Sequence, residues 1–213
     1  RPVVPALGTG YFTEREGKVM LKGLGHTKAV TLVLISLSVL GLAGCGGAKQ
    51  EAAKPVKKIG VIQFVQHGAL DAANKGFVDG LASRGYKDGE NIKIDQQNAQ
   101  GDQSNLKTIS QRFVNDKVAL IYALATPAAQ IVANETKDIP IVGSAITDYV
   151  AAKLVKANDK PGGNVTGTTN YMPARRQIDL ALKLVPQAKT VGALYNLGEV
   201  NSQMQVKEMK AYA

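Results

Sequence analysis

Residues 118–144, VALIYALATPAAQIVANETKDIPIVGS, decide the fold, because they predict a strand, a sharp turn, a helix and a second strand in close succession. The opening run VALIYA has β-branched and aromatic members, as is typical of a strand buried on both faces. Thr126 can cap the following helix, and Pro127 suits its first turn, where a missing N–H costs nothing. Residues 128–135 are helix-forming, and residues 139–142 (IPIV) predict the next strand.

The turn between this strand and this helix predicts a site for a small anion. The first N–H groups of a helix have no partner within the helix, and the helix dipole adds partial positive charge at the same end. A carboxylate is a group that such an end binds. The alternative is an ordinary β-α-β unit with a capped helix and no ligand.

Strands and helices also alternate before this segment. Residues 58–65 (KIGVIQFV) and 91–95 predict strands, each followed by a helix, the second of which starts at Asp102. These helices carry apolar residues on one face: Leu70, Ala73, Phe77 and Leu81, then Leu106, Ile109 and Phe113. The predicted fold class is α/β, a parallel sheet with helices on both faces. Ligands of such sheets bind beyond the C-terminal ends of the strands, which here carry Gln66 and His67, residues 125–128 and residues 144–148.

Residues 161–163 (PGG) interrupt the alternation and open an extended polar segment, NVTGTTNY. We therefore expect a two-lobe architecture. Residues 57–160 form lobe I, residues 161–169 form a hinge crossover, and residues 170–213 form part of lobe II.

The predicted lobe II is small. It contains a helix after Pro173, a strand over residues 190–195, and a last helix that Asn201 can cap. One strand and two helices fall well below the usual size of an independent domain. We therefore expect lobe II to be truncated in this sequence.

The N-terminal part predicts an export signal. Lys22 and Lys28 precede the apolar run AVTLVLISLSVL, which small residues follow. This run is too short to cross a bilayer comfortably as a permanent helix. The motif LAGC, which ends at Cys45, resembles the lipobox of bacterial lipoproteins, in which the chain is cut before the Cys and the Cys carries the lipid. The alternative is a buried apolar helix that happens to contain a Cys.

The lipobox resemblance divides this part into three segments. Residues 1–19 are expected to be upstream DNA translated in frame, because Met20 is a sensible start residue. Residues 20–44 are then a signal peptide, and residues 45–56 are the lipidated Cys45 with a flexible tether. The protein is expected outside the cytoplasm, lipid-anchored to the bacterial cell membrane on its periplasmic or cell-surface side.

Composition argues against several other classes of protein. The net charge is +9, but the lysines are scattered, which argues against nucleic acid as a partner. Aromatic residues make up 5% of the chain and there is no Trp, so a base-stacking platform is not expected. The only Cys and the two His, His26 and His67, do not cluster in sequence, so neither a metal site nor a Cys–His nucleophile is expected.

Several motifs together resemble one known family. They are the lipobox followed by KIGVIQFVQHGALDAANKGFVDGL, NAQGD, ATPAAQ, KDIPIV, TDYV, PGGNVTG and YNLGEVNS. The chain is similar to the substrate-binding lipoproteins of ABC importers with a type I periplasmic-binding-protein fold. Within that group it is most similar to the aromatic amino acid (tryptophan/tyrosine) binding proteins.

The resemblance implies a role in transport. Two lobes close on a small-molecule ligand, which is delivered to a membrane permease driven by an ATPase subunit, without catalysis or a cofactor. The lobe I contacts that it implies are Gln66, His67, Ala125, Thr126, Pro127, Thr147 and Asp148. The lobe II contacts that it implies are Tyr195, Asn196, Glu199, Asn201 and Ser202.

Physical chemistry suggests how an amino acid would be held. The N–H groups of Ala128 and Ala129, with the Thr126 hydroxyl, suit an α-carboxylate. Asp148 or Glu199 can pair with an α-ammonium. The alternatives are that Asp148 only starts the following helix and that Glu199 is only solvated.

An aromatic side chain of the ligand could pack on Tyr195 and His67. The alternatives are that Tyr195 packs in the core and that His67 is only a turn residue.

Other functions are open at this point. An enzyme would fit the architecture, but the chain has no G-x-x-x-x-G-K-[ST], G-x-S-x-G or G-x-G-x-x-G motif. A sugar-sensing transcription regulator would need a helix-turn-helix where the export signal lies. Within solute binding, the ligand could instead be a nucleoside, a sugar or another amino acid. A lipid-anchored sensory receptor is the remaining alternative.

Overall fold

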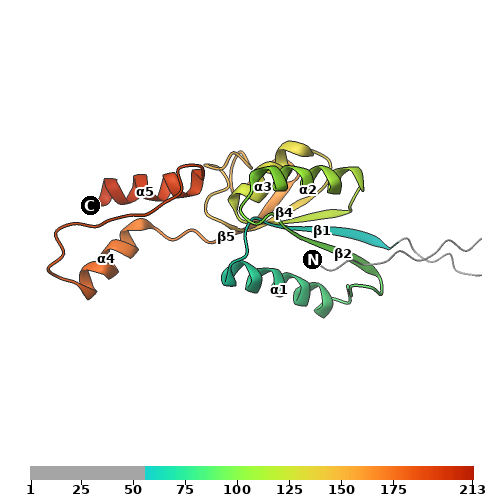
Figure 1. Cartoon of the computed structure of the whole chain (residues 1–213), viewed down its shortest axis with the longest axis horizontal. Coiled ribbons are helices and arrows are strands. Elements are labelled where there is room, and N and C mark those ends of the chain that lie inside the picture. Colours follow the sequence, from blue (N-terminus) through green and yellow to red (C-terminus); the bar gives the residue numbers. More distant parts are fainter. Residues whose placement is uncertain (1–55) are drawn as a thin grey trace, which may run out of the picture. The chain divides into compact units, whose positions relative to one another are not determined.

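The computed structural model describes residues 56–213, so the predicted signal peptide, Cys45 and nearly all of the tether lie outside the described residues. The elements follow the predicted alternation (Figure 1), and they are β1 (Lys57–Gln63), α1 (Gly68–Ser83), β2 (Ile92–Asn98), α2 (Gln103–Asn115), β3 (Leu120–Leu124), α3 (Thr126–Glu135), β4 (Ile141–Ile146), β5 (Val165–Thr169), α4 (Ala174–Leu184) and α5 (Val200–Tyr212).

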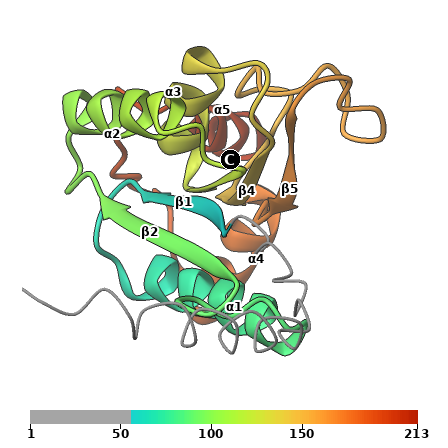
Figure 2. The ribbon, with the colours of Figure 1, turned by 90° about the vertical axis from the view of Figure 1, so that its right-hand side faces the viewer.

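The five strands form one parallel sheet in the order β2-β1-β3-β4-β5. Helices α2 and α3 cover one face and α1 covers the other (Figure 2). The predicted fold class is therefore confirmed for lobe I. Because all strands run in the same direction, their C-terminal ends meet at one edge of the sheet.

The two faces of the sheet are packed differently. Under α2 and α3, Leu106 and Phe113 are fully buried against the sheet, as the predicted apolar face requires. Phe113 lies so close to Gly60 that a Cβ on Gly60 would meet its ring at 2.6 Å. On the other face, Phe77 of α1 stacks on Tyr122 of β3, with ring centroids 3.9 Å apart and an interplanar angle of 8°.

The predicted crossover segment supplies β5, which pairs with β4 in parallel. The pairing shifts register between Gly143 and Ile146, where Ala145 has a φ of 56°. Tyr149 closes this irregularity, because its hydroxyl donates to the Gly143 carbonyl at 2.9 Å and lies 3.1 Å from the Thr168 carbonyl. Whether residues 161–169 also act as a hinge stays a prediction.

Two predictions about lobe II are wrong. Residues 190–195 form no strand, and Leu194 is fully exposed. The described part of lobe II offers this segment no neighbouring strand, and an unpaired strand is not stable in water. Helix α5 begins at Val200, with Glu199 at its N-cap position, so Asn201 lies in the first turn and does not cap the helix.

Among residues 56–213, no helix combines the length and the apolar character that crossing a bilayer requires. In the same residues, His, Cys, Asp and Glu side chains form no group of three that could hold a metal ion.

Candidate ligand-binding site

The N-terminus of α3 lies at the C-terminal edge of the sheet, directly after β3. Ala125 makes the turn with a φ of 77° and a ψ of 153°, and its N–H donates to the carbonyl of Ser144 on the neighbouring strand at 3.0 Å. The helix then begins at Thr126, with Pro127 in its first turn. The predicted cap is therefore wrong: Ala125 occupies the N-cap position, and no side chain caps the helix.

Polar groups without partners gather at this helix end. Thr126 is 2% exposed, and its hydroxyl has no hydrogen-bond partner. Within the described residues, the N–H groups of Thr126 and Ala128 donate to no protein acceptor. The Ala129 N–H, in contrast, donates to the Ala125 carbonyl at 3.2 Å. The predicted role of Ala129 is therefore wrong, and the Thr126 N–H takes its place beside Ala128.

The end of β1 carries Gln66 and His67, both exposed. His67 occupies the N-cap position of α1, and its Nδ1 accepts a hydrogen bond from the Ala69 N–H at 3.2 Å. His67 thus has a structural role in starting a helix.

The end of β4 places Asp148 in a half-buried turn. One carboxylate oxygen accepts hydrogen bonds from the N–H groups of Val150 and Ala151, both at 2.8 Å. The following residues form turns and no helix, so Asp148 orders a turn with one oxygen. Thr147 is buried, and its carbonyl accepts a hydrogen bond from the Thr169 hydroxyl at 2.8 Å.

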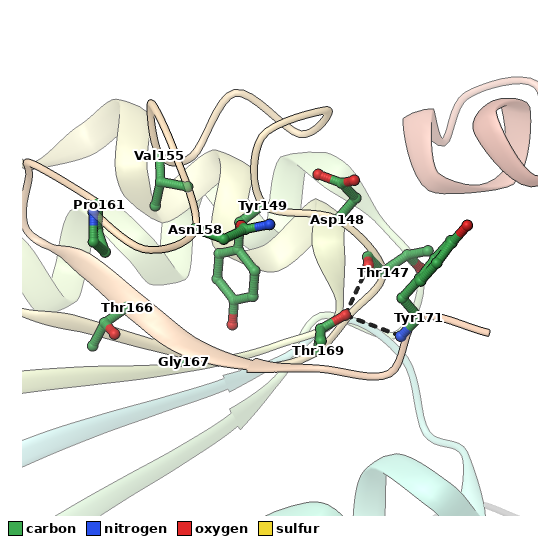
Figure 3. A pocket seen from close by; sticks show the side chains of 10 residues that line it. All are labelled: Thr147, Asp148, Tyr149, Val155, Asn158, Pro161, Thr166, Gly167, Thr169 and Tyr171. Atoms are coloured by element: carbon green, nitrogen blue, oxygen red, sulfur yellow. Dashed lines mark hydrogen bonds between the residues drawn. The ribbon is translucent and has the colours of Figure 1, made fainter. Parts of the chain in front are cut away.

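A cavity of about 250 Å³, called here the β5 cavity, opens between the end of β4, strand β5 and the loop that joins them (Figure 3). Only two of the predicted site residues, Thr147 and Asp148, line this cavity. Its lining residues are Thr147, Asp148, Tyr149, Val155, Asn158, Pro161, Thr166, Gly167, Thr169 and Tyr171. Its two aromatic side chains, Tyr149 and Tyr171, were not predicted.

Both aromatic residues have phenols that stay neutral over the physiological range. Burial raises the pKa of Tyr149 to about 12, and Tyr122 nearby adds to the rise. The pKa of Tyr171 is also raised, mainly because its hydroxyl donates to the Glu208 carboxylate. One feature of the sequence could have indicated them, because both residues directly flank segments at strand ends.

The predicted lobe II residues form a separate local cluster around Glu199. Asn196 and Asn201 donate from their side-chain amides to the two oxygens of Glu199, at 3.0 and 3.3 Å. Ser202 follows in α5, and Tyr195 is 39% exposed and lines a separate hollow along α5. None of these residues lines the β5 cavity.

Comparisons with known proteins identify the family. Residues 58–213 match the family model described as ABC transporter substrate binding protein. A "Tyrosine-binding protein" of Clostridioides difficile is 48% identical over 194 residues, which cover 85% of this chain and 56% of the relative.

Two solved structures are also similar. One is an ABC domain from Streptococcus pneumoniae in complex with L-Trp, with 51% identity, a TM-score of 0.71, and coverage of 74% of this chain and 53% of that chain. The other is a ligand-free, open substrate-binding protein with adhesive properties from Clostridium difficile, with 52% identity, a TM-score of 0.61, and coverage of 74% and 54%. The chain thus spans about half the length of these relatives. The chain belongs to the family of ABC transporter substrate-binding proteins.

Proposed function

We propose that the intact protein is the solute-binding component of an ABC importer, which binds an aromatic amino acid between two lobes. It delivers this ligand to the permease and its ATPase subunit and catalyses no reaction. The observation that carries the proposal is the buried, unpartnered Thr126 hydroxyl at the uncapped N-terminus of α3. A polar group buried without a partner is unfavourable, and a ligand acceptor at this helix end would satisfy it.

The ends of β3 and β4 suit the two charged groups of an α-amino acid. The N–H groups of Thr126 and Ala128, with the Thr126 hydroxyl, bind the α-carboxylate. The Asp148 oxygen that the turn does not use pairs with the α-ammonium. Strands β3 and β4 are neighbours, and neighbouring strands lie roughly 4.8 Å apart. Thr126 and Asp148 each lie two residues beyond the ends of these neighbouring strands, so both belong to the same edge of the sheet.

An aromatic side chain is favoured over other amino acid side chains by two observations. The β5 cavity, which contains Asp148, is walled by Tyr149, Tyr171, Val155 and Pro161, and aromatic rings pack well against such walls. One relative is named a tyrosine-binding protein. A second relative was solved in complex with L-Trp.

The proposed location is the outer face of the bacterial cell membrane, where lipid on Cys45 holds the protein near its permease. The lipobox pattern at residues 42–45 supports this proposal. Mass spectrometry of the membrane-extracted protein should find a diacylglyceryl group on the peptide that begins at Cys45. A peptide that continues through Gly44 into unmodified Cys45 would refute the anchor.

Thermal denaturation of the intact mature protein, without lipid, tests the ligand. At a hundred times its dissociation constant, a ligand should add about 2.7 kcal/mol to the free energy of unfolding. L-Trp, L-Tyr or L-Phe should raise the melting temperature. Tryptamine, which lacks the carboxylate, and indole-3-propionate, which lacks the ammonium, should not. A shift with a nucleoside or sugar alone would show that the substrate class is wrong.

A further inference from the structure

Tyr171 is fixed to lobe I through its backbone. It lies two residues beyond the end of β5, and its N–H donates to the Thr169 hydroxyl at 3.0 Å. The same hydroxyl donates to the Thr147 carbonyl at 2.8 Å (Figure 3). The Asn170 N–H donates to the Ile146 carbonyl at 3.2 Å. The chain therefore leaves the sheet along a defined path, which fixes where the Tyr171 side chain starts.

The side chain of Tyr171 has contacts in two places. Tyr171 is part of the lining of the β5 cavity, and its ring extends past Asp148 towards α5 (Figure 3). Its hydroxyl donates to the carboxylate of Glu208 in α5 at 3.0 Å. One side chain thus joins the cavity wall to a helix of lobe II.

We propose that Tyr171 is a positioning and specificity-determining residue of the ligand site, whose hydrogen bond to Glu208 holds its ring as a cavity wall and makes that wall depend on the position of α5. This inference rests on the proposed function, because the wall faces the aromatic side chain of the ligand. When α5 is in place, the Tyr171 ring is held and the wall is complete. When α5 moves away, the ring loses its second anchor.

The chemistry of the contact suits this role. A hydrogen bond to a carboxylate is charge-assisted and fixes the ring in one orientation. A fixed ring makes affinity sensitive to the shape of an aromatic ligand, because pre-organised walls bind with less loss of conformational entropy. A tyrosine hydroxyl is protonated at physiological pH and can therefore donate, and the hydrogen bond to Glu208 raises the pKa of Tyr171 further.

The affinity arm of the test measures L-Trp, L-Tyr and L-Phe by isothermal titration calorimetry on the intact mature protein. Tyr171→Phe keeps the ring and removes the hydroxyl, so affinity should fall roughly five- to tenfold, as for the loss of one hydrogen bond. In Tyr171→Ala, affinity should fall further, and the order of the three ligands by affinity should change. In a double-mutant cycle, the double variant Tyr171→Phe/Glu208→Ala should lose no more affinity than Tyr171→Phe alone.

Tyr212 supplies the matched control. Its hydroxyl donates to Asp179 at 2.6 Å, so it joins α5 to α4 by the same chemistry but does not line the β5 cavity. Tyr212→Phe should leave affinity within about twofold of the wild type. Additive losses in the cycle, or equal losses for Tyr171→Phe and Tyr212→Phe, would overturn the inference.

A second arm needs no ligand. Nitroxide labels at Lys107→Cys in α2 and Lys210→Cys in α5, with Cys45→Ser, report the distance between lobe I and α5 by electron spin resonance. Tyr171→Phe should broaden this distance distribution. An unchanged distribution overturns the inference whatever the ligand proves to be. If the wild type binds none of the three amino acids, the proposed function fails, and the distance arm alone decides whether Tyr171 and α5 are coupled.

Discussion

Replacing Thr126 with Val separates stability from binding at the α3 N-terminus. Val has nearly the shape of Thr and is also β-branched, so the change replaces a buried hydroxyl with a methyl group. A buried polar group without a partner costs about 1–3 kcal/mol, and Thr126 is 2% exposed with an unpartnered hydroxyl. The ligand-free variant should therefore be more stable by about 1 kcal/mol or more.

The same change should weaken the ligand complex. The hydroxyl donates to the ligand carboxylate in the proposed site, and a hydrogen bond to a charged group contributes about 1.5–3 kcal/mol. Affinity for L-Trp should fall roughly 10- to 150-fold. Urea denaturation with and without L-Trp measures both effects on one sample. The expected result is opposite signs: a higher urea midpoint without ligand and a smaller shift with it.

Thr136 provides the control, because it is equally buried but satisfied. It is 7% exposed, and its hydroxyl accepts hydrogen bonds from the N–H groups of Asp138 and Ile139, both at 3.2 Å. Thr136→Val should destabilise the protein by about 1–3 kcal/mol, because two donors lose their acceptor. If Thr126→Val destabilises the free protein as Thr136→Val does, the Thr126 hydroxyl has a partner in solution and the reasoning fails.

Three further changes test the fold around the site. Gly167→Ala should unfold or strongly destabilise the protein, since Gly167 has a φ of 153° and a Cβ there would collide with the Gly143 carbonyl. A melting temperature within 2 °C of the wild type, which corresponds to roughly 1 kcal/mol or less, would contradict this expectation. The pKa of Tyr149 is raised to about 12, so folding favours its protonated form and stability should fall as pH rises from 10 towards 12; in urea denaturation over this range, Tyr149→Phe should lose less stability than the wild type. Asp102 caps α2 by accepting from the Asn105 N–H at 2.9 Å, so Asp102→Ala should lower the urea midpoint and Asp102→Asn should largely restore it.

Lobe I could be predicted from sequence because its elements carry their own periodic signals. The apolar spacing in α2 predicts the buried positions of Leu106 and Phe113, and both are fully buried. The strand before α3 is apolar throughout, as a strand covered on both faces must be. Strands that alternate with helices of this length pair in parallel. The order of the elements in the sequence is therefore enough to predict that the C-terminal ends of the strands share one edge of the sheet.

Backbone geometry and partner availability are less visible in the sequence. Thr126 was expected to cap α3, but Ala125 makes the turn with a positive φ, which no property of Ala predicts. The β-rich run at residues 190–195 forms no strand, because strand formation depends on a neighbour and not on propensity alone. The sequence does not predict the β5 cavity for a related reason, since Tyr149 and Tyr171 line one cavity only when β5 pairs with β4.

The two halves of the proposed site differ in what holds them. The groups for the ligand's carboxylate and ammonium come from the ends of β3 and β4, which the sheet fixes whether or not lobe II is in place. The Tyr171 wall depends instead on Glu208 in α5. An amino acid would therefore meet lobe I first through the groups that all amino acids share. The aromatic wall would be completed only as α5 takes its place, so discrimination among side chains would accompany closure of the lobes.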